Sequence, residues 1–551
     1  MTENPRQCST GSGLMMDCAL NISSILRRAA RVYPEQQIVS RLNDGSIHRY
    51  TYTDFCGRVI RLMNALRQLG VEPGDRIGTF AWNSYHHLEL YYAVPAVGAI
   101  LHTINIRQFS DIRAATINHA QDKLIFVDRS LANSLAEISD SIPCVQLFVA
   151  MDDLGPAPES TPQPFVQYEE LLSTAPETTC FADDDERSAA CLCYTSGTTG
   201  EPKGVLYSHR SVYLHAMGSC MADSFGLSER SVILPVVPMF HVNAWGLPYA
   251  ALLTGARLVL PGSHTVGRPL ADLMATEKVT FSAGVPTVWT LLIQHLRQHH
   301  HDLSSLNTVI VGGSALPVSL IKDYKRDYDV DLIQVWGMTE TSPIGTVSRV
   351  KTGLASLDAD QQLQIRGTQG LPVPGVEIRI CDDDGFELPW DGETSGDLQV
   401  RGPWVASSYY GETADQSAFT NDGWFKTGDV ATVSHLGYMQ ITDRQKDLIK
   451  SRGEWISSVA LENAVVAHPD VLEAAVVSRL DDLRGEAPVV FIVLRDPGTP
   501  VKPGDVLDLL RQSFERWQIP RPSDVHTIEA LPKTGVGKID KKVLRRQLRS
   551  K

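Results

Sequence analysis

The sequence lacks several features that define whole classes of protein. No window approaches about 18 consecutive apolar residues, so no transmembrane helix is predicted. No CxxC pair occurs, and the 9 cysteines are scattered and odd in number, so their spacing predicts neither a zinc site nor a disulfide framework. The histidine triple at 299–301 has no second ligand cluster, and we interpret it as a solvated segment at a helix end.

Positive charge is also scarce. The chain carries 50 Lys and Arg residues against 64 Asp and Glu, which gives a formal charge of −14. Because nucleic-acid affinity comes mainly from cationic contacts with phosphates, this balance argues against a nucleic-acid partner. The N-terminus has no basic region followed by an apolar core, so we expect no secretory signal, reduced thiols and a cytoplasmic location.

The composition is otherwise that of an ordinary globular protein. The 551 residues are 43% hydrophobic and 21% charged, and at ~100–200 residues per domain they predict three or four structural units. Short apolar runs alternate with helical segments, a pattern typical of parallel sheets covered by helices on both faces. The predicted strands are Ala189–Tyr194, Val279–Ala283, Thr308–Val311 and Leu332–Val335.

The pattern changes after Gly370. Short strands at Val376–Ile380, Asp397–Val400 and Tyr438–Ile441 are separated by Gly-rich turns, which favours an antiparallel, barrel-like unit. A last unit follows from residue 447. Its clearest helix is predicted over 506–517, where apolar residues recur with helical spacing.

One loop carries the strongest chemical signal. Residues 194–204 read Tyr-Thr-Ser-Gly-Thr-Thr-Gly-Glu-Pro-Lys-Gly and lie between a predicted strand and a helix expected to begin near Ser208. Backbone N–H groups of such a loop can wrap a polyphosphate, and Lys203 adds a positive charge. The loop is not a Walker A motif, because Pro202 and Gly204 occupy the places that need Gly and Ser or Thr.

This loop resembles the phosphate loop of the adenylate-forming superfamily, which includes acyl-CoA synthetases, luciferases and peptide-synthetase adenylation domains. Six further segments resemble the core motifs of that superfamily and occur in its order: Pro238–Gly246, Val311–Ala315, Trp336–Glu340, Gly423–Asp429, Asp443–Asp447 and Pro532–Lys538. Within the superfamily, the segments Met239–Trp245 and Gly453–Ser458 are most similar to medium- and long-chain fatty acyl-CoA synthetases.

The resemblance implies an α/β fold in two domains. A large N-terminal domain, 1–445, would hold two doubly wound sheets and a β-barrel-like subdomain with the ATP and acyl sites. A small, mobile α+β C-terminal domain, 446–551, would follow a hinge at Lys446. The implied reaction has two steps. A carboxylate attacks the α-phosphate of ATP to give acyl-AMP and pyrophosphate, and the thiol of CoA then displaces AMP.

The resemblance also implies a nucleotide site. Residues expected to bind ATP are Thr195, Ser196, Gly197, Thr198, Thr199, Gly200, Lys203, Gly313, Ser314, Ala315, Trp336, Gly337, Met338, Asp429 and Arg444. Trp336 stands where the family usually has a Tyr that packs on adenine, and either ring can stack. Thr339 would contact the α-phosphate, and Glu340 would bind Mg²⁺, a hard cation that prefers oxygen ligands.

The remaining implied roles concern catalysis, the acid and CoA. Lys538 would neutralise charge between the attacking carboxylate and the α-phosphate, while His241 and Trp245 would border the acyl pocket. The alternative for Trp245 is a packed core aromatic. After rotation at the hinge, Lys538 would leave and Gly453 would line the CoA channel.

Two positions depart from the fatty-acid branch. Arg452 stands where that branch usually has Gly, and Ile106 stands where it usually has Pro. Arg452 either points toward the CoA phosphates or pairs on the surface with a carboxylate such as Glu454. Neither departure removes a catalytic residue, but both leave the exact acid open.

We therefore expect a medium- or long-chain fatty acyl-CoA ligase that uses Mg²⁺, ATP and CoA. Its partners would be small molecules, with peripheral membrane contact and a homodimer left open. The alternatives are a CoA ligase for another hydrophobic acid (terpenoid, steroid side chain, methylthio or aryl), a luciferase-like oxygenase, and a non-catalytic binding protein. The presence of motifs for both half-reactions argues against a non-catalytic binding protein.

Overall fold

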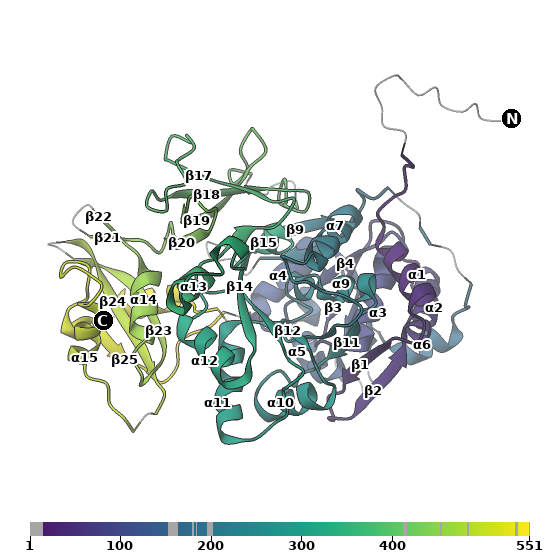
Figure 1. Cartoon of the computed structure of the whole chain (residues 1–551). Helices are drawn as coiled ribbons and strands as arrows, with labels where there is room; N and C mark the ends of the chain where they lie inside the picture. Colours follow the sequence, from purple (N-terminus) through teal and green to yellow (C-terminus); the bar gives the residue numbers. More distant parts are fainter. Residues whose placement is uncertain are drawn as a thin grey trace.

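The computed structural model describes residues 15–549 except 152–163, 179–180, 183–184, 196–201, 412–415, 452–453, 482–483, 497 and 535–537. Two large sheets and the helices that cover them come first in the chain, an antiparallel sheet follows them, and the C-terminal unit lies at one end of the molecule (Figure 1). Among the described helices, none is both long enough and apolar enough to cross a membrane.

The first large sheet has seven strands in the order β7-β6-β5-β3-β4-β8-β9. All neighbours are parallel except β8 and β9. The strands are β3 (Arg76–Phe80), β4 (Ile100–Thr103), β5 (Asp122–Val127), β6 (Leu147–Ala150), β7 (Phe165–Gln167), β8 (Ala189–Tyr194) and β9 (Gly204–Ser208), with α4 (Ser110–Ala120), α5 (Ala132–Ala136) and α6 (Tyr168–Thr174) between them.

The second large sheet has nine strands in the order β16-β15-β14-β13-β12-β10-β11-β1-β2. It is parallel from β14 to β1 and antiparallel at both edges. The strands are β1 (Gln37–Arg41), β2 (Ile47–Thr51), β10 (Val232–Pro235), β11 (Arg257–Leu260), β12 (Phe281–Gly284), β13 (Thr308–Val311), β14 (Asp331–Gly337), β15 (Ile344–Val347) and β16 (Leu371–Pro372). The helices between these strands include α10 (Gly267–Thr276), α11 (Pro286–Gln298), α12 (Val318–Tyr328) and α13 (Ala359–Arg366).

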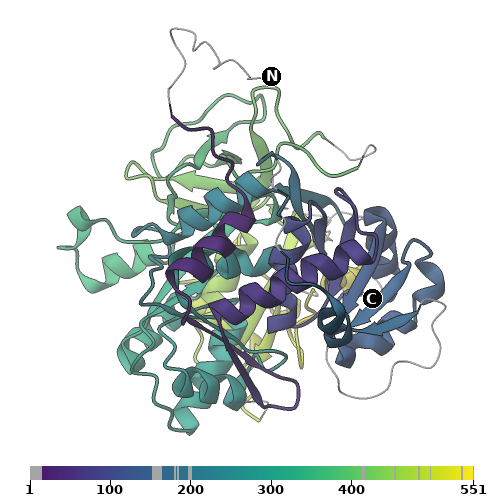
Figure 2. The same cartoon turned by 90° about the vertical axis from the view of Figure 1, so that its right-hand side faces the viewer.

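Helices between the two sheets form the central layer of the core, and Figure 2 shows them passing between the sheets. They are α1 (Ile22–Val32), α2 (Tyr52–Gln68), α3 (Tyr85–Ala96), α7 (His209–Cys220) and α9 (Leu247–Thr254). Every residue of α3 is buried, as expected for a helix enclosed on all sides.

Alternation along the strands explains why both faces of each sheet are covered. Leu124 and Phe126 of β5 point into the central core, whereas Ile125 and Val127 pack with α4 and α5 on the opposite face. Apolar residues of α10, α11 and α12 cover the outer face of the nine-stranded sheet in the same way. Both sheets are therefore doubly wound, and the predicted fold class is confirmed by the structure.

The unit predicted after Gly370 is an antiparallel sheet in the order β17-β18-β19-β20. Its strands are β17 (Glu377–Cys381), β18 (Gly396–Arg401), β19 (Phe425–Val433) and β20 (Met439–Arg444). Among the described residues, β17 and β20 are the two edge strands of this sheet and do not pair with each other. The strand predicted over Tyr438–Ile441 corresponds to β20, which begins one residue later and ends three residues later than expected.

The C-terminal unit has a five-stranded sheet with an apolar cluster on each face. Its elements are β21 (Ile449–Ser451), β22 (Glu454–Ile456), α14 (Ser458–Val466), β23 (Val471–Asp481), β24 (Gly485–Leu494), α15 (Pro503–Leu510), β25 (Val525–Thr527) and α16 (Lys541–Arg549). Short helices elsewhere are α8 (Val242–Trp245), η1 (Arg129–Leu131), η2 (Ser139–Ser141), η3 (Thr339–Thr341), η4 (Thr352–Leu354) and η5 (Pro522–Asp524).

The helix predicted over 506–517 was too long, because α15 ends at Leu510. Turns follow, in which the N–H groups of Gln512 and Ser513 bond to carbonyls three residues back. These turns still bring Phe514 and Trp517 against the apolar core of the unit. The apolar spacing therefore persisted although the regular helix did not.

Candidate active site

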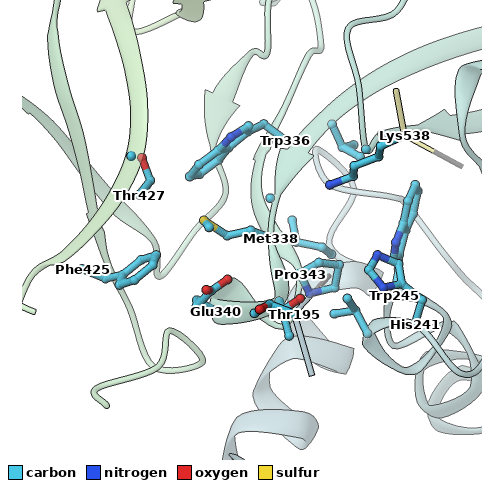
Figure 3. Close-up of a pocket in the computed structure, with 18 of the residues that line it drawn as sticks. Thr195, His241, Trp245, Trp336, Met338, Glu340, Pro343, Phe425, Thr427 and Lys538 are labelled. Carbon is cyan, nitrogen blue, oxygen red and sulfur yellow. The ribbon is translucent and has the colours of Figure 1, made fainter. Parts of the chain in front are cut away.

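The candidate site lies at the carboxyl ends of β10, β12, β13 and β14. From β10 the chain passes to β11 on one side and then to β12 on the other side, so the loops after β10 and β12 diverge. A crevice at such a point is where open α/β sheets bind ligands. A cavity of about 320 Å³ opens there. It brings together Thr195, Lys203, His241, Trp245, Gly313, Trp336, Gly337, Met338, Thr339, Glu340, Arg444, Lys446 and Lys538 (Figure 3).

The described ends of the phosphate loop lie at one side of this cavity. The N–H of Thr195 donates to the Lys203 carbonyl at 2.9 Å, and the N–H of Lys203 donates to Thr195 Oγ1 at 3.2 Å. These bonds close the stem of the loop between β8 and β9. Residues Ser196, Gly197, Thr198, Thr199 and Gly200 lie outside the described residues.

Thr339 and Glu340 follow β14 in the short helix η3. The Tyr207 hydroxyl donates to the Thr339 carbonyl at 2.6 Å, and the Tyr409 hydroxyl donates to Glu340 Oε1 at 2.7 Å. Glu340 is 4% exposed, and burial raises the pKa of its carboxyl above the ordinary value. No group of three metal-ligating side chains that could hold a metal occurs in the described part of the chain. Glu340 is thus a buried carboxylate that lines the cavity.

The nucleotide side is organised around Asp429. The indole N–H of Trp336 donates to Asp429 Oδ2 at 2.9 Å, and Arg444 Nε lies 3.4 Å from Asp429 Oδ1. Asp429 and Arg444 face each other across the β19–β20 ladder, which explains why residues 15 positions apart meet. The contact between Trp336 and Asp429 was not foreseen from the sequence.

Two glycines are required by close approach. A Cβ on Gly337 would lie 1.5 Å from the Pro343 carbonyl oxygen. Gly313 has φ +89°, and a Cβ there would approach Val285 and the Lys538 side chain. Ser314 and Ala315 line an adjoining cavity of about 330 Å³ together with Asp429, Arg444, Lys446 and Lys538.

Lys538 reaches both cavities from the C-terminal unit. The N–H of Thr534 donates to the Lys538 carbonyl at 2.7 Å, which closes the loop that carries the lysine. Removal from water, reinforced by the charge of Arg444, lowers the pKa of Lys538 to about 8, although Asp429 and Glu340 oppose the shift. In Figure 3 its ammonium points between Trp336 and the side chains of His241 and Trp245.

His241 and Trp245 border the apolar side of the cavity. All four residues of α8 have φ between 47° and 56°, so they form a left-handed turn that aims Trp245 inward. Trp245 is 5% exposed, and a Cβ on Gly312 would lie 3.1 Å from its indole. Burial lowers the pKa of His241 to about 3, with help from the charges of Lys538 and Arg107, so its imidazole is neutral.

Phe225 also lines this cavity, and no motif indicated it. The carbonyl of the preceding residue, Ser224, accepts from Arg349 Nε at 2.8 Å, and the N–H of Ser348 donates to the Gln334 carbonyl at 2.9 Å. The side chains of Val237, Val242, Val285 and Val335 line the same cavity.

Lys446 lies in the turn between β20 and β21 and lines both cavities. The residue is exposed overall, but partial burial of its ammonium, together with the charge of Arg444, lowers its pKa to about 8. Arg545 of α16 pairs with the adjacent Asp447 at 2.6 Å. The predicted CoA-channel residues Arg452 and Gly453 lie outside the described residues.

Two protein-family models and several known proteins match this chain. The AMP-binding enzyme family model matches residues 26–410, and the AMP-binding enzyme C-terminal domain model matches residues 460–538. The chain is 44% identical to a long-chain-fatty-acid–CoA ligase of Thermus thermophilus, with 97% of each chain covered. It is 43% identical to a medium-chain-fatty-acid–CoA ligase of Ectopseudomonas oleovorans, again with 97% of each covered.

Two further similarities bear on substrate and fold. A 3-methylmercaptopropionyl-CoA ligase of Ruegeria lacuscaerulensis is 44% identical, with 97% of this chain and 98% of that protein covered. The crystal structure of the anthranilate CoA ligase AuaEII with anthranoyl-AMP superposes with a TM-score of 0.85 at 25% identity, covering 97% of this chain and 98% of that chain.

Proposed function

Because the chain belongs to the AMP-binding enzyme family, we propose that it is an acid–thiol ligase for medium- or long-chain fatty acids. It converts the acid, ATP and CoA to acyl-CoA, AMP and pyrophosphate. One observation carries the proposal. The same cavity has a cationic side with Lys203, Arg444 and Lys538 and an apolar side with Phe225 and Trp245. Such a cavity suits a molecule with a polyphosphate at one end and a hydrocarbon at the other.

In the first half-reaction, an oxygen of the substrate carboxylate attacks the α-phosphorus of ATP and pyrophosphate leaves. Two anions must approach each other, so the ammonium of Lys538 stabilises the charge that accumulates between them. Thr195 and Lys203 hold the β- and γ-phosphates, and Thr339 bonds to the α-phosphate. Asp429, oriented by Trp336 and Arg444, accepts hydrogen bonds from the ribose.

Glu340 would hold Mg²⁺ together with the phosphates of ATP. A buried carboxylate that lines the cavity fits this ion, which usually keeps several waters and binds through one or two carboxylates and substrate oxygens. When bound, the ion neutralises charge on the phosphate oxygens.

In the second half-reaction, the sulfur of CoA attacks the acyl carbonyl carbon and AMP leaves. We propose that residues 446–551 turn about Lys446 between the two steps, which withdraws Lys538 and admits CoA past Gly453 and Arg452. Two apolar clusters built almost entirely within the C-terminal unit support its movement as a body. The ion pair between Arg545 and Asp447 lies within residues 446–551, so it can move together with the unit.

A second candidate substrate is a short thioether acid. It is favoured by the 44% identity to the 3-methylmercaptopropionyl-CoA ligase over nearly the whole chain. Chain-length preference separates the two, because burying each added methylene is worth about 0.8 kcal/mol until the apolar side is full.

The test is a panel of acids from acetate to palmitate, with 3-methylthiopropionate and benzoate included. Pyrophosphate release is measured with and without CoA, and the thioester products are identified by mass. We expect kcat/KM to rise with chain length from acetate and then level off. A preference for acetate or for benzoate would refute the fatty-acid assignment, and a preference for 3-methylthiopropionate would establish the second candidate.

A further inference from the structure

Tyr409 joins two groups that come from different parts of the fold. Its hydroxyl donates to Glu340 Oε1 at 2.7 Å, and the Lys203 ammonium lies 4.6 Å from the centre of its ring. Glu340 follows β14 of the nine-stranded sheet, Lys203 precedes β9 of the seven-stranded sheet, and Tyr409 follows β18 of the antiparallel sheet. One aromatic side chain therefore contacts a carboxylate and an ammonium on the wall of a single cavity.

The backbone beside Tyr409 binds the same two segments. The N–H of Ala406 donates to the Glu340 carbonyl at 2.8 Å, and the N–H of Tyr410 donates to the Gly204 carbonyl at 2.8 Å. These bonds fix the distance between the η3 helix and the start of β9. The position of Tyr409 is thus set by main-chain contacts to both of its partners' segments.

The ring is held rigidly as well. Tyr409 is 8% exposed and meets Phe419 edge to face, with ring centres 5.3 Å apart. It meets Phe425 in the same manner at 6.5 Å. Such packing leaves the phenol few orientations, so its hydroxyl reaches Glu340 without a large loss of side-chain freedom.

The chemistry of the two contacts differs. A hydroxyl bonded to one carboxylate oxygen fixes the rotation of the carboxyl group and leaves lone pairs of the second oxygen for a cation. The electron-rich face of the ring attracts the ammonium of Lys203 without consuming any of its three donors. Neither contact with Tyr409 therefore prevents Glu340 or Lys203 from binding a ligand in the cavity.

We propose that Tyr409 is a positioning residue that orients Glu340 toward Mg²⁺ and Lys203 toward the phosphates of ATP. The inference rests on the proposed function, because it assumes that Mg²⁺·ATP occupies this cavity. The competing view is that Tyr409 only packs against Phe419 and Phe425.

The experiment separates the hydroxyl from the ring. Tyr409→Phe removes the hydroxyl and keeps the ring, whereas Tyr409→Leu removes both. Tyr410→Phe is the matched control, because it removes a hydroxyl from the next residue, whose ring contacts His119 at 5.4 Å. For each protein, the Kd for ATP is measured by calorimetry without acid or CoA, once with excess Mg²⁺ and once with EDTA.

We expect Tyr409→Phe to weaken binding about tenfold or more in Mg²⁺ and to leave the Kd in EDTA nearly unchanged, because only the carboxylate loses its partner. Tyr409→Leu should also weaken binding in EDTA, by about two- to fivefold, through loss of the ring beneath Lys203. Tyr410→Phe should match the wild type in both conditions.

Two results would overturn the proposal. An unchanged Kd for Tyr409→Phe in Mg²⁺ would show that the hydroxyl does not orient the metal ligand. Equal weakening in Mg²⁺ and EDTA would show general damage to the site, as the packing view requires. If the wild-type protein itself did not bind ATP in either condition, the proposed function would fail rather than the role of Tyr409.

Discussion

The first half-reaction should slow at alkaline pH, because Lys538 loses its positive charge there. An ordinary lysine remains protonated until about pH 10.4, but burial and the charge of Arg444 lower the pKa of Lys538 to about 8. The lysine is therefore charged below pH 8 and loses its charge as the pH rises through that value. Since only the ammonium can stabilise the transition state, the rate must follow the protonated fraction.

The size of the effect follows from the pKa. With a pKa of about 8, roughly nine tenths of the enzyme carries the ammonium at pH 7 and roughly one tenth at pH 9. We expect kcat/KM for acid-dependent pyrophosphate release, measured without CoA, to fall about tenfold over that interval. This constant is the right readout, because it reports the pKa of the free enzyme.

Three variants isolate the responsible group. Lys538→Arg keeps a charge at all accessible pH values, so its profile should be flat whatever its absolute rate. Lys538→Ala should be slower by on the order of a hundredfold and equally flat. Lys446 also has a pKa near 8, and its charge helps to lower the pKa of Lys538. Lys446→Met therefore serves as the control: the fall in rate should persist and should begin at a somewhat higher pH.

The reasoning would be refuted in two ways. A wild-type rate that stays constant from pH 7 to pH 9 would show that Lys538 does not titrate there or is not needed. If Lys446→Met abolished the pH dependence and Lys538→Arg preserved it, the titrating group would be Lys446 rather than Lys538. Thioester formation from supplied acyl-AMP should show no such fall, because the proposed rotation withdraws Lys538 before that step.

Three other substitutions test separate parts of the site. Phe225→Ala should move the preferred acid to longer chains, with each added methylene worth about fourfold in kcat/KM; an unchanged optimum would place the end of the acyl side elsewhere. Trp336→Phe keeps an aromatic ring but removes the donor to Asp429, so the KM for ATP should rise about tenfold or more, and an unaltered KM would contradict that role. Lys446→Pro fixes φ in the proposed hinge, so pyrophosphate release should survive while thioester formation collapses, and intact thioester formation would mean that the pivot lies at another residue.

Local sequence patterns were sufficient for many of the elements. The predicted strands Ala189–Tyr194 and Thr308–Val311 have the bounds found in the structure, and Leu332–Val335 lies inside β14. Each is a short apolar run between turn-forming residues, and a strand buried on both faces needs little more. The helix predicted to reach Trp517 failed because apolar spacing records which side chains face the core, and turns can satisfy that spacing as well as a helix.

Some residues of the candidate site could be predicted from sequence patterns, and others could not. Residues in motifs, such as Lys203, Glu340 and Lys538, could be named from the sequence, and they line one cavity in the structure while their roles stay predictions. Tyr409 and Phe225 could not be named, because no periodicity or spacing marks them. Both lie next to contacts with segments more than 60 residues away. Tyr409 bonds to Glu340, and the carbonyl of Ser224, next to Phe225, accepts from Arg349.

The sequence alone determined the kinds of elements, the order of the motifs and the family. Those properties depend on turn chemistry and side-chain periodicity, which act over a few residues. Only the tertiary structure decided that β12 lies beside β10 rather than beside β11, which opens the crevice. It likewise decided that Tyr409, in the loop between β18 and β19, meets Glu340 after β14 and Lys203 before β9. Such pairings depend on which apolar faces bury each other across hundreds of residues, and no short-range pattern encodes that choice.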